Sequence, residues 1–248
     1  MSTDAATRLP ATATPARRAV FITLRVLVAA AILAALVVTF TGSSADWTAA
    51  GYPDRATLVT NFWSYFTVDS NVGSVVVLLI GAVLLIRGQV RDPGWFSILR
   101  ASVVAYMTVT GVVYNLLLRG VSVSGAAQDV QWTNEVLHVI GPIYLVLDWL
   151  LAPGRRPIEW KRLAVILAFP LVWTIYSLVR GLFVYDQVRA RDSWYPYPFL
   201  DPTVSANGYL SVAFYVIMIT VLFGVVGSLV VWISRRGSNP DRSGILAE

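Results

Sequence analysis

The chain has 248 residues, of which 56% are hydrophobic and only 13% are charged, and its mean hydropathy is +0.66. A soluble domain carries about twice that charged fraction, so the composition excludes an ordinary soluble protein and predicts an integral membrane protein. The formal net charge of +5 does not indicate a nucleic-acid partner, because the basic residues lie between apolar stretches. With no cysteine in the chain, disulfides, thiolate catalysis and cysteine-ligated metals are excluded.

Six apolar stretches approach the length of about 20 residues that a helix needs to cross the hydrocarbon core. We expect a helix at each, because backbone groups that face lipid must be hydrogen-bonded within their own segment. The expected spans are 19–41, 61–86, 98–118, 134–151, 162–184 and 208–233. The first is longer than the apolar core of a signal peptide, so we expect it to be retained. The predicted fold class is all-α: a polytopic bundle of six transmembrane helices over residues 19–233, between a disordered N-terminal segment (1–18) and a tail (234–248).

The arginine and lysine residues set the expected orientation. Most of them lie in the N-terminal segment, in the second and fourth loops and in the tail. The other side of the membrane receives only Arg55, Arg119, Arg189 and Arg191. The positive-inside rule therefore predicts that both termini are cytoplasmic and that the chain lies in the cell membrane.

Polar side chains gather in the outer half of four of these spans. Thr67 and Asn71 lie in the second span, Asn115 in the third, His138 in the fourth and Arg180 in the fifth. If the second span is one regular helix, a single face carries Trp63, Thr67, Ser70, Asn71 and Ser74. This convergence predicts a site inside the membrane that faces the extracytoplasmic side.

His138 is the only histidine of the chain, which excludes haem, di-iron and zinc sites that need several imidazoles. An ionisable group within a membrane span is costly and is usually functional, although a histidine that only bridges two helices is the other interpretation. Glu135, three residues earlier, is expected to accept a hydrogen bond from the imidazole. Pro142 has no N–H, so the carbonyl oxygen of residue 138 is expected to need another donor.

Charged residues inside the spans predict two structural ion pairs. Asp69 lies two positions from Thr67 and points elsewhere on a regular helix, so we expect it to neutralise Arg180 rather than to touch the Thr67 hydroxyl. Asp148, near the cytoplasmic end of the fourth span, is expected to pair with Arg25 of the first span.

Three short segments carry a family resemblance: residues 65–71 (YFTVDSN), 134–142 (NEVLHVIGP) and 194–198 (WYPYP). In this order along a six-helix chain they resemble the androgen-induced and androgen-dependent TFPI-regulating membrane proteins and their bacterial relatives. The eukaryotic members are threonine hydrolases that cleave fatty acid esters of hydroxy fatty acids with a threonine and a histidine. The resemblance implies that Thr67 is the nucleophile and His138 the base. Asp69 and the short spacing between Thr67 and His138 depart from the family's pattern.

Two functions follow from these observations. The first is a lipid-ester hydrolase without a metal or an organic cofactor, in which His138 deprotonates Thr67, Asn134 or Glu135 orients the imidazole, and Asn71 or Asn115 donates to the oxyanion. The second is a non-enzymatic lipid or small-molecule binder, or a permease-like protein, in which Arg180 attracts an anionic head group. A rhomboid-type protease is excluded because no membrane helix carries a Gly-x-Ser-x-Gly-like sequence. The expected partner is a membrane lipid or lipid ester, with no nucleic acid and no prediction of oligomeric state.

Overall fold

The computed structural model describes residues 14–120 and 131–236, which form helices and loops with one isolated β-bridge between Asp186 and Arg191. Six helical segments of this part of the chain are long and apolar enough to cross a membrane: Pro15–Ala49, Phe66–Ile86, Gly94–Leu118, Gln131–Leu151, Trp160–Gly181 and Tyr209–Arg235. The expected all-α bundle of six apolar helices is therefore confirmed. Of the segments expected to be disordered, residues 1–13 and 237–248 lie outside the described residues. Residues 15–18 and 234–235 are instead helical, because the first helix begins earlier and the last ends later than predicted.

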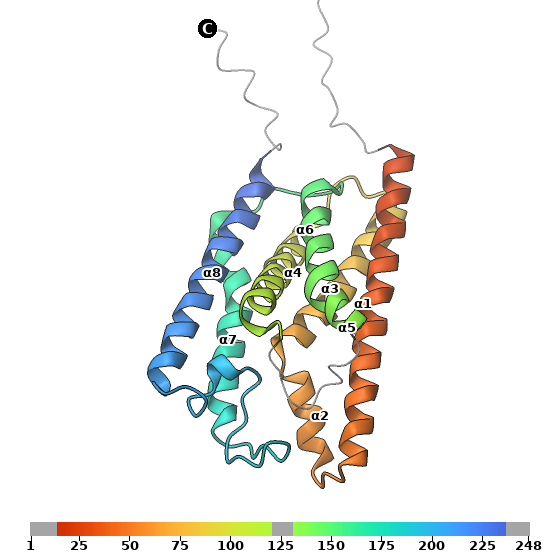
Figure 1. Cartoon of the computed structure of the whole chain (residues 1–248). Helices are drawn as coiled ribbons and strands as arrows, with labels where there is room; N and C mark the ends of the chain where they lie inside the picture. The colour runs from red at the N-terminus through yellow and green to blue at the C-terminus, as the bar shows by residue number, and fades with distance from the viewer. Residues whose placement is uncertain (1–13, 121–130, 237–248) are drawn as a thin grey trace, which may run out of the picture.

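The elements follow one another as a series of helices that are joined by turns and by the long 182–208 loop (Figure 1). The first half contains α1 (Pro15–Ala49), α2 (Arg55–Trp63), α3 (Phe66–Ile86), α4 (Gly94–Val113) and the π-helical turn η1 (Tyr114–Leu118). The second half contains α5 (Gln131–Glu135), the π-helical turn η2 (Val136–Ile140), α6 (Gly141–Leu151), η3 (Trp160–Arg162), α7 (Leu163–Gly181), η4 (Pro198–Leu200) and α8 (Tyr209–Arg235).

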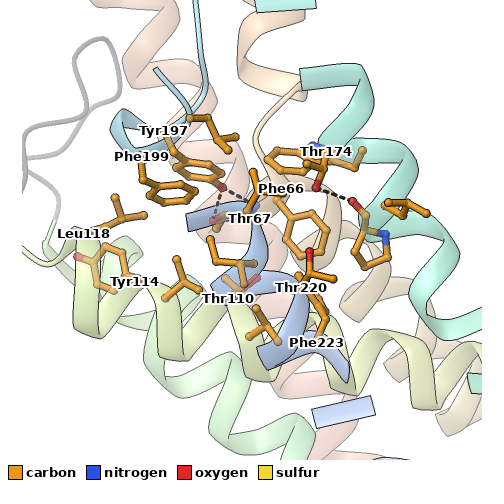
Figure 2. Close-up of a pocket in the computed structure, with 18 of the residues that line it drawn as sticks. Phe66, Thr67, Thr110, Tyr114, Leu118, Thr174, Tyr197, Phe199, Thr220 and Phe223 are labelled. Atoms are coloured by element: carbon orange, nitrogen blue, oxygen red, sulfur yellow. Dashed lines mark hydrogen bonds between the residues drawn. The ribbon is translucent and has the colours of Figure 1, made fainter. Parts of the chain in front are cut away.

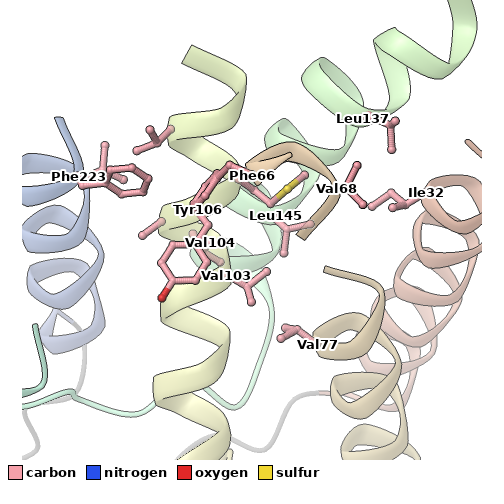
Figure 3. Packing of buried hydrophobic residues seen from close by; sticks show 14 of the residues in the cluster. Ile32, Phe66, Val68, Val77, Val103, Val104, Tyr106, Leu137, Leu145 and Phe223 are labelled. Atoms are coloured by element: carbon pink, nitrogen blue, oxygen red, sulfur yellow. The ribbon is translucent and has the colours of Figure 1, made fainter. Parts of the chain in front are cut away.

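The helix α4 occupies the middle of the bundle and packs against α3, α6, α7 and α8, while α1 runs along α3. Figure 1 places the start of α1 and the end of α8 at one end of the bundle, and α2 with the 182–208 loop at the other. The side chains that meet between the helices are apolar, as Figure 3 shows for Val104 and Tyr106 of α4, Phe66 of α3 and Phe223 of α8. This apolar core packs α3, α4, α7 and α8 around a cavity.

The second span is not the regular helix over 61–86 that the sequence predicts. It breaks at Ser64 and Tyr65, and Tyr65 has an extended backbone with φ −76° and ψ 127°. Side-chain hydrogen bonds hold the chain at the break. The Ser64 hydroxyl bonds to the Thr60 carbonyl and to the Tyr176 hydroxyl, and the Trp173 indole donates to the Ser64 carbonyl. Only Trp63 leaves the predicted shared face, because it belongs to α2. The other four residues of that face lie within α3, namely Thr67, Ser70, Asn71 and Ser74.

A buried charge cluster joins α1, α4 and α6 near the end of the bundle where the chain enters and leaves. The Asp148 carboxylate accepts hydrogen bonds from Arg25 at 2.8 and 3.1 Å and from Arg100 at 2.7 Å, and Arg100 also donates to Asp92 at 2.9 Å. The expected pair of Arg25 and Asp148 is thus present, but the cluster is larger than predicted. Arg100 is fully buried within α4 rather than in a loop, so it does not belong among the topology-setting charges.

The charge cluster also explains why residue 81 of α3 is a glycine. A Cβ atom at Gly81 of α3 would lie 2.6 Å from a terminal guanidinium nitrogen of Arg25 and 3.2 Å from the ring of Phe96. Such a contact is shorter than non-bonded atoms tolerate, so the absent side chain at Gly81 gives the Arg25 guanidinium its space beside α3.

We predict that Asp148→Asn destabilises the protein by ~3–5 kcal/mol, because it leaves two buried guanidinium groups with only Asp92 as a counter-charge. Thermal unfolding in detergent, followed by near-UV circular dichroism, measures the effect. Glu159→Gln is the matched control, because its ion pair with Lys161 is exposed, and its melting temperature should equal that of the wild type. Equal melting temperatures for both variants would contradict a structural role of the cluster.

Candidate functional site

A cavity of about 250 Å³ lies between α3, α4, α7 and α8, in the half of the bundle that contains α2 and the 182–208 loop (Figure 2). Its wall is mostly apolar, with Phe66, Val109, Leu167, Ile219 and Phe223 among the lining side chains. Tyr197, Phe199 and Leu200 close it from the side of the loop. An apolar cavity with a few polar groups is the usual form of a small-molecule site.

Thr67 brings a hydroxyl group to the edge of this cavity. Because α3 begins at Phe66, the N–H of Thr67 lies in the first turn and has no partner inside the helix. The phenol oxygen of Tyr197 accepts this N–H at 3.1 Å and lies 3.2 Å from the Thr67 hydroxyl (Figure 2). The break after α2 therefore presents both the backbone N–H and the hydroxyl of Thr67 to one tyrosine.

His138 lies behind the wall of the cavity rather than on it. Its Nδ1 is 3.0 Å from the Asn134 carbonyl oxygen, and its ring stacks on Tyr114 with 3.8 Å between ring centroids. Tyr114 lines the cavity, whereas His138 is not among the lining residues. Thr67 and His138, the two residues predicted to react together, thus have different hydrogen-bond partners in this structure.

One amide connects the elements that carry these two residues. The Asn71 Nδ2 atom donates to the Thr67 carbonyl at 2.9 Å and to the Leu137 carbonyl, next to His138, at 3.2 Å. This amide joins the second and fourth spans, but the predicted meeting of the Thr67 hydroxyl and the His138 imidazole in one pocket is not observed, because His138 does not line the cavity. Both N–H groups of Asn71 are used in this bridge, so its expected role as an oxyanion donor is not supported, and its buried Oδ1 atom has no hydrogen-bond partner among the described residues.

Asn115 satisfies the carbonyl group that Pro142 leaves without a donor. Its Nδ2 atom donates to the Gly111 carbonyl at 2.8 Å and to the His138 carbonyl at 3.3 Å, and its Oδ1 atom accepts from Arg119 at 2.9 Å. The expectation that the His138 carbonyl needs an outside donor is therefore met. Because Asn115 is fully occupied by these bonds, it does not face the cavity as the predicted oxyanion donor.

The charged residues near the site differ from the prediction in their partners. Glu135 does not hold the imidazole but forms a two-bond ion pair with Arg119, at 2.9 and 3.2 Å, on a partly exposed surface. Residue 134 contacts the imidazole through its backbone carbonyl. The guanidinium group of Arg119 lies outside the membrane-spanning helices. Its hydrogen bond with Glu135 raises the pKa of Arg119 above its usual value.

The expected ion pair between Asp69 and Arg180 is not formed among the described residues. Arg180 donates to the Asn61 side chain at 2.8 Å, and its guanidinium group lies 5.2 Å from the centre of the Trp194 ring. The prediction failed because it placed Asn61 and Asp69 on one helix, whereas the break at Ser64 turns Asn61 of α2 toward α7.

Tyr114 and Tyr197 are the site residues that sequence reasoning did not assign. Tyr197 belongs to the aromatic segment at 194–198, which the sequence analysis used only as a family motif. The signal that was available is the pair of prolines at 196 and 198, which fixes the local backbone of a loop rich in aromatic residues. Nothing in the spacing of the sequence indicates that Tyr197 reaches the first turn of α3.

We predict that Asn115→Ala lowers stability by about 1 kcal/mol, because it removes the hydrogen bonds to the Gly111 and His138 carbonyls at the surface of the bundle. Thermal unfolding in detergent measures the change. Asn207→Ala in the exposed part of the 182–208 loop is the control and should unfold at the wild-type temperature. An Asn115→Ala variant as stable as this control would show that water or another donor replaces the amide.

Comparisons with known proteins do not identify the site. No protein-family model, no curated protein and no solved structure matches the chain. Function therefore has to be inferred from the geometry of the cavity and from the short motifs that resemble the threonine hydrolases.

Proposed function

We propose that the protein is a membrane lipid-ester hydrolase with Thr67 as its nucleophile. The observation that carries this proposal is the position of the Thr67 hydroxyl at the edge of an apolar cavity. The cavity would hold an acyl chain and place its ester carbonyl next to the hydroxyl. By resemblance, the substrates are similar to fatty acid esters of hydroxy fatty acids.

Two of the other three threonines of the cavity use their hydroxyl groups in packing contacts, and the third, Thr220 of α8, lies on the exposed side of the cavity. The Thr174 hydroxyl donates to the Pro170 carbonyl of its own helix at 2.8 Å, and the Thr110 hydroxyl is bonded to Ser70 at 3.1 Å. Both bonds are ordinary packing contacts of membrane helices. The Thr67 hydroxyl is instead bonded to a loop side chain, Tyr197, at the start of a helix, where it has no carbonyl of an earlier turn to bind.

Entry of the substrate from the bilayer is supported by two exposed lining residues. Leu171 of α7 is 59% exposed, and Thr220 of α8 is also exposed, so the cavity reaches the outside of the bundle between these helices. In a membrane this surface faces acyl chains rather than water. The buried aromatic residues of the 182–208 loop cover the cavity at its aqueous end.

The proposed reaction needs a base for the Thr67 proton, and His138 is the candidate. The imidazole takes the hydroxyl proton, the Thr67 oxygen attacks the ester carbonyl, and the alcohol leaves with that proton. Water then hydrolyses the acyl-threonine, which releases the carboxylic acid and restores Thr67.

His138 must leave the Tyr114 ring to reach Thr67. The two stacked residues belong to the π-helical turns η1 and η2, a form of helix that is frequent at functional sites. Catalytic hydrogen bonds tighten when a substrate binds, so the proposed contact between His138 and Thr67 would form in the complex with the ester.

A second candidate function is a lipid-binding or permease-like protein without catalysis. The observation that favours it is that His138 bonds to Asn134 while Thr67 bonds to Tyr197, so that nucleophile and base are unconnected. The same cavity would then hold an acyl chain without breaking an ester bond.

We predict that the purified protein in detergent reacts with a fluorophosphonate probe and hydrolyses a long-chain p-nitrophenyl ester. Thr67→Ala and His138→Ala should abolish both signals, because one removes the nucleophile and the other the base. Thr174→Ala is the matched control, since it deletes another cavity hydroxyl and should retain activity. A wild-type protein that binds a spin-labelled fatty acid without labelling or hydrolysis would support the binder, provided that Thr67→Ala binds equally well.

The proposed orientation places both ends of the chain in the cytoplasm and the 182–208 loop outside. The absence of native cysteines allows single cysteines to test it. We predict that a membrane-impermeant maleimide labels Asp192→Cys in intact cells but labels Gln89→Cys only after permeabilisation, because residue 89 lies in the turn between α3 and α4. Labelling in the reverse order would invert the orientation and place the cavity near the cytoplasm.

A further inference from the structure

The 182–208 loop fixes the phenol of Tyr197 at the start of α3. Its side chain is 8% exposed, and its ring stacks on Phe199 with 5.1 Å between centroids. The rings of Tyr65 and Trp173 pack against its other sides at 5.6 and 6.0 Å. The loop itself is tied to α7 by the hydrogen bond from the Trp194 N–H to the Gly181 carbonyl at 3.1 Å. Tyr197 therefore has little freedom to point its hydroxyl elsewhere.

The hydrogen bonds of Tyr197 leave its own proton available for Thr67. Its oxygen accepts the Thr67 N–H at 3.1 Å, and the Thr67 hydroxyl oxygen lies 3.2 Å away. Burial raises the pKa of Tyr197 to about 12, so the phenol is neutral at pH 7. A neutral phenol at this position is a hydrogen-bond donor and not a base, so it complements His138 instead of replacing it.

We propose that Tyr197 is a catalytic residue of the hydrolase, whose O–H donates a hydrogen bond to the Thr67 oxygen whenever that oxygen carries negative charge. This inference rests on the proposed function. Charge develops on the Thr67 oxygen when the nucleophile is deprotonated, and again when it leaves the acyl intermediate. In both steps the proton of Thr67 travels to and from His138, and Tyr197 keeps its own.

The bond contributes to rate because it strengthens as the reaction proceeds. In the resting state two neutral hydroxyl groups face each other and either can donate. When the Thr67 oxygen becomes anionic it can only accept, and a charge-assisted hydrogen bond in an apolar cavity is stronger than a neutral one. An interaction gained on the way to the transition state raises kcat and leaves substrate binding unchanged.

The experiment compares Tyr197→Phe with Tyr195→Phe on the same long-chain ester in detergent. Tyr195 is a matched control because it is a buried tyrosine of the same loop that packs on Gly181. We expect Tyr197→Phe to lower kcat by roughly 100-fold with KM nearly unchanged, as for the loss of one donor to a developing charge. Tyr195→Phe should keep the wild-type kcat. Equal kcat values for the two variants would overturn the inference.

A second measurement keeps the inference testable if Tyr197→Phe fails to fold. Tyr197→3,5-difluorotyrosine keeps the ring and the hydroxyl but lowers the pKa of the phenol. Because only the protonated phenol donates, activity should be lost at a lower pH on the alkaline side than in the wild type. The nearest other titratable groups, Tyr65 and Asp69, are the same in both proteins. An unshifted alkaline limb would also overturn the inference, whereas a wild-type protein without any hydrolysis would overturn the proposed function instead.

Discussion

Backbone groups that a membrane helix cannot satisfy by itself determine where the candidate site forms. The break at Ser64 leaves the Thr67 N–H without an intrahelical partner, and Pro142 leaves the His138 carbonyl without one. In hydrocarbon each such group needs a partner from elsewhere in the protein. Tyr197 supplies an acceptor for the first and Asn115 a donor for the second. Tyr197 thereby joins the loop to α3 at the cavity, while Asn115 joins the third span to the fourth behind the cavity wall.

The buried charge cluster and the cavity lie in different halves of the bundle. The cluster of Arg25, Arg100, Asp92 and Asp148 lies toward the end where α1 starts and α8 ends, and its ion pairs join α1, α4 and α6. Removing one partner would leave a buried charge without its counter-charge. The cavity half holds Thr67 and Tyr197 among aromatic rings. None of these four charged residues lines the cavity.

The parts of the structure that depend on hydropathy and on local backbone chemistry could be predicted from the sequence. These include the six apolar helices, the pairing of Arg25 with Asp148 and the need for a donor at the His138 carbonyl. The partners of Glu135 and Arg180 could not be predicted, because they depend on how neighbouring helices are rotated. The break at Ser64 is held by Tyr176 and Trp173, which are more than 100 residues away. No periodicity within the second span contains that information.

A threonine hydroxyl in an apolar cavity reacts only if its negative charge is stabilised from the moment it forms. In the proposed reaction His138 removes the proton and becomes positively charged one hydrogen bond away from the Thr67 oxygen. The low-dielectric surroundings disfavour an isolated anion on that oxygen. Tyr197, bonded to the N–H and the hydroxyl of the same residue, is positioned to meet this requirement without moving. Under the proposed function, Tyr197 would act as a fixed donor and His138 as a base that has to turn away from Tyr114.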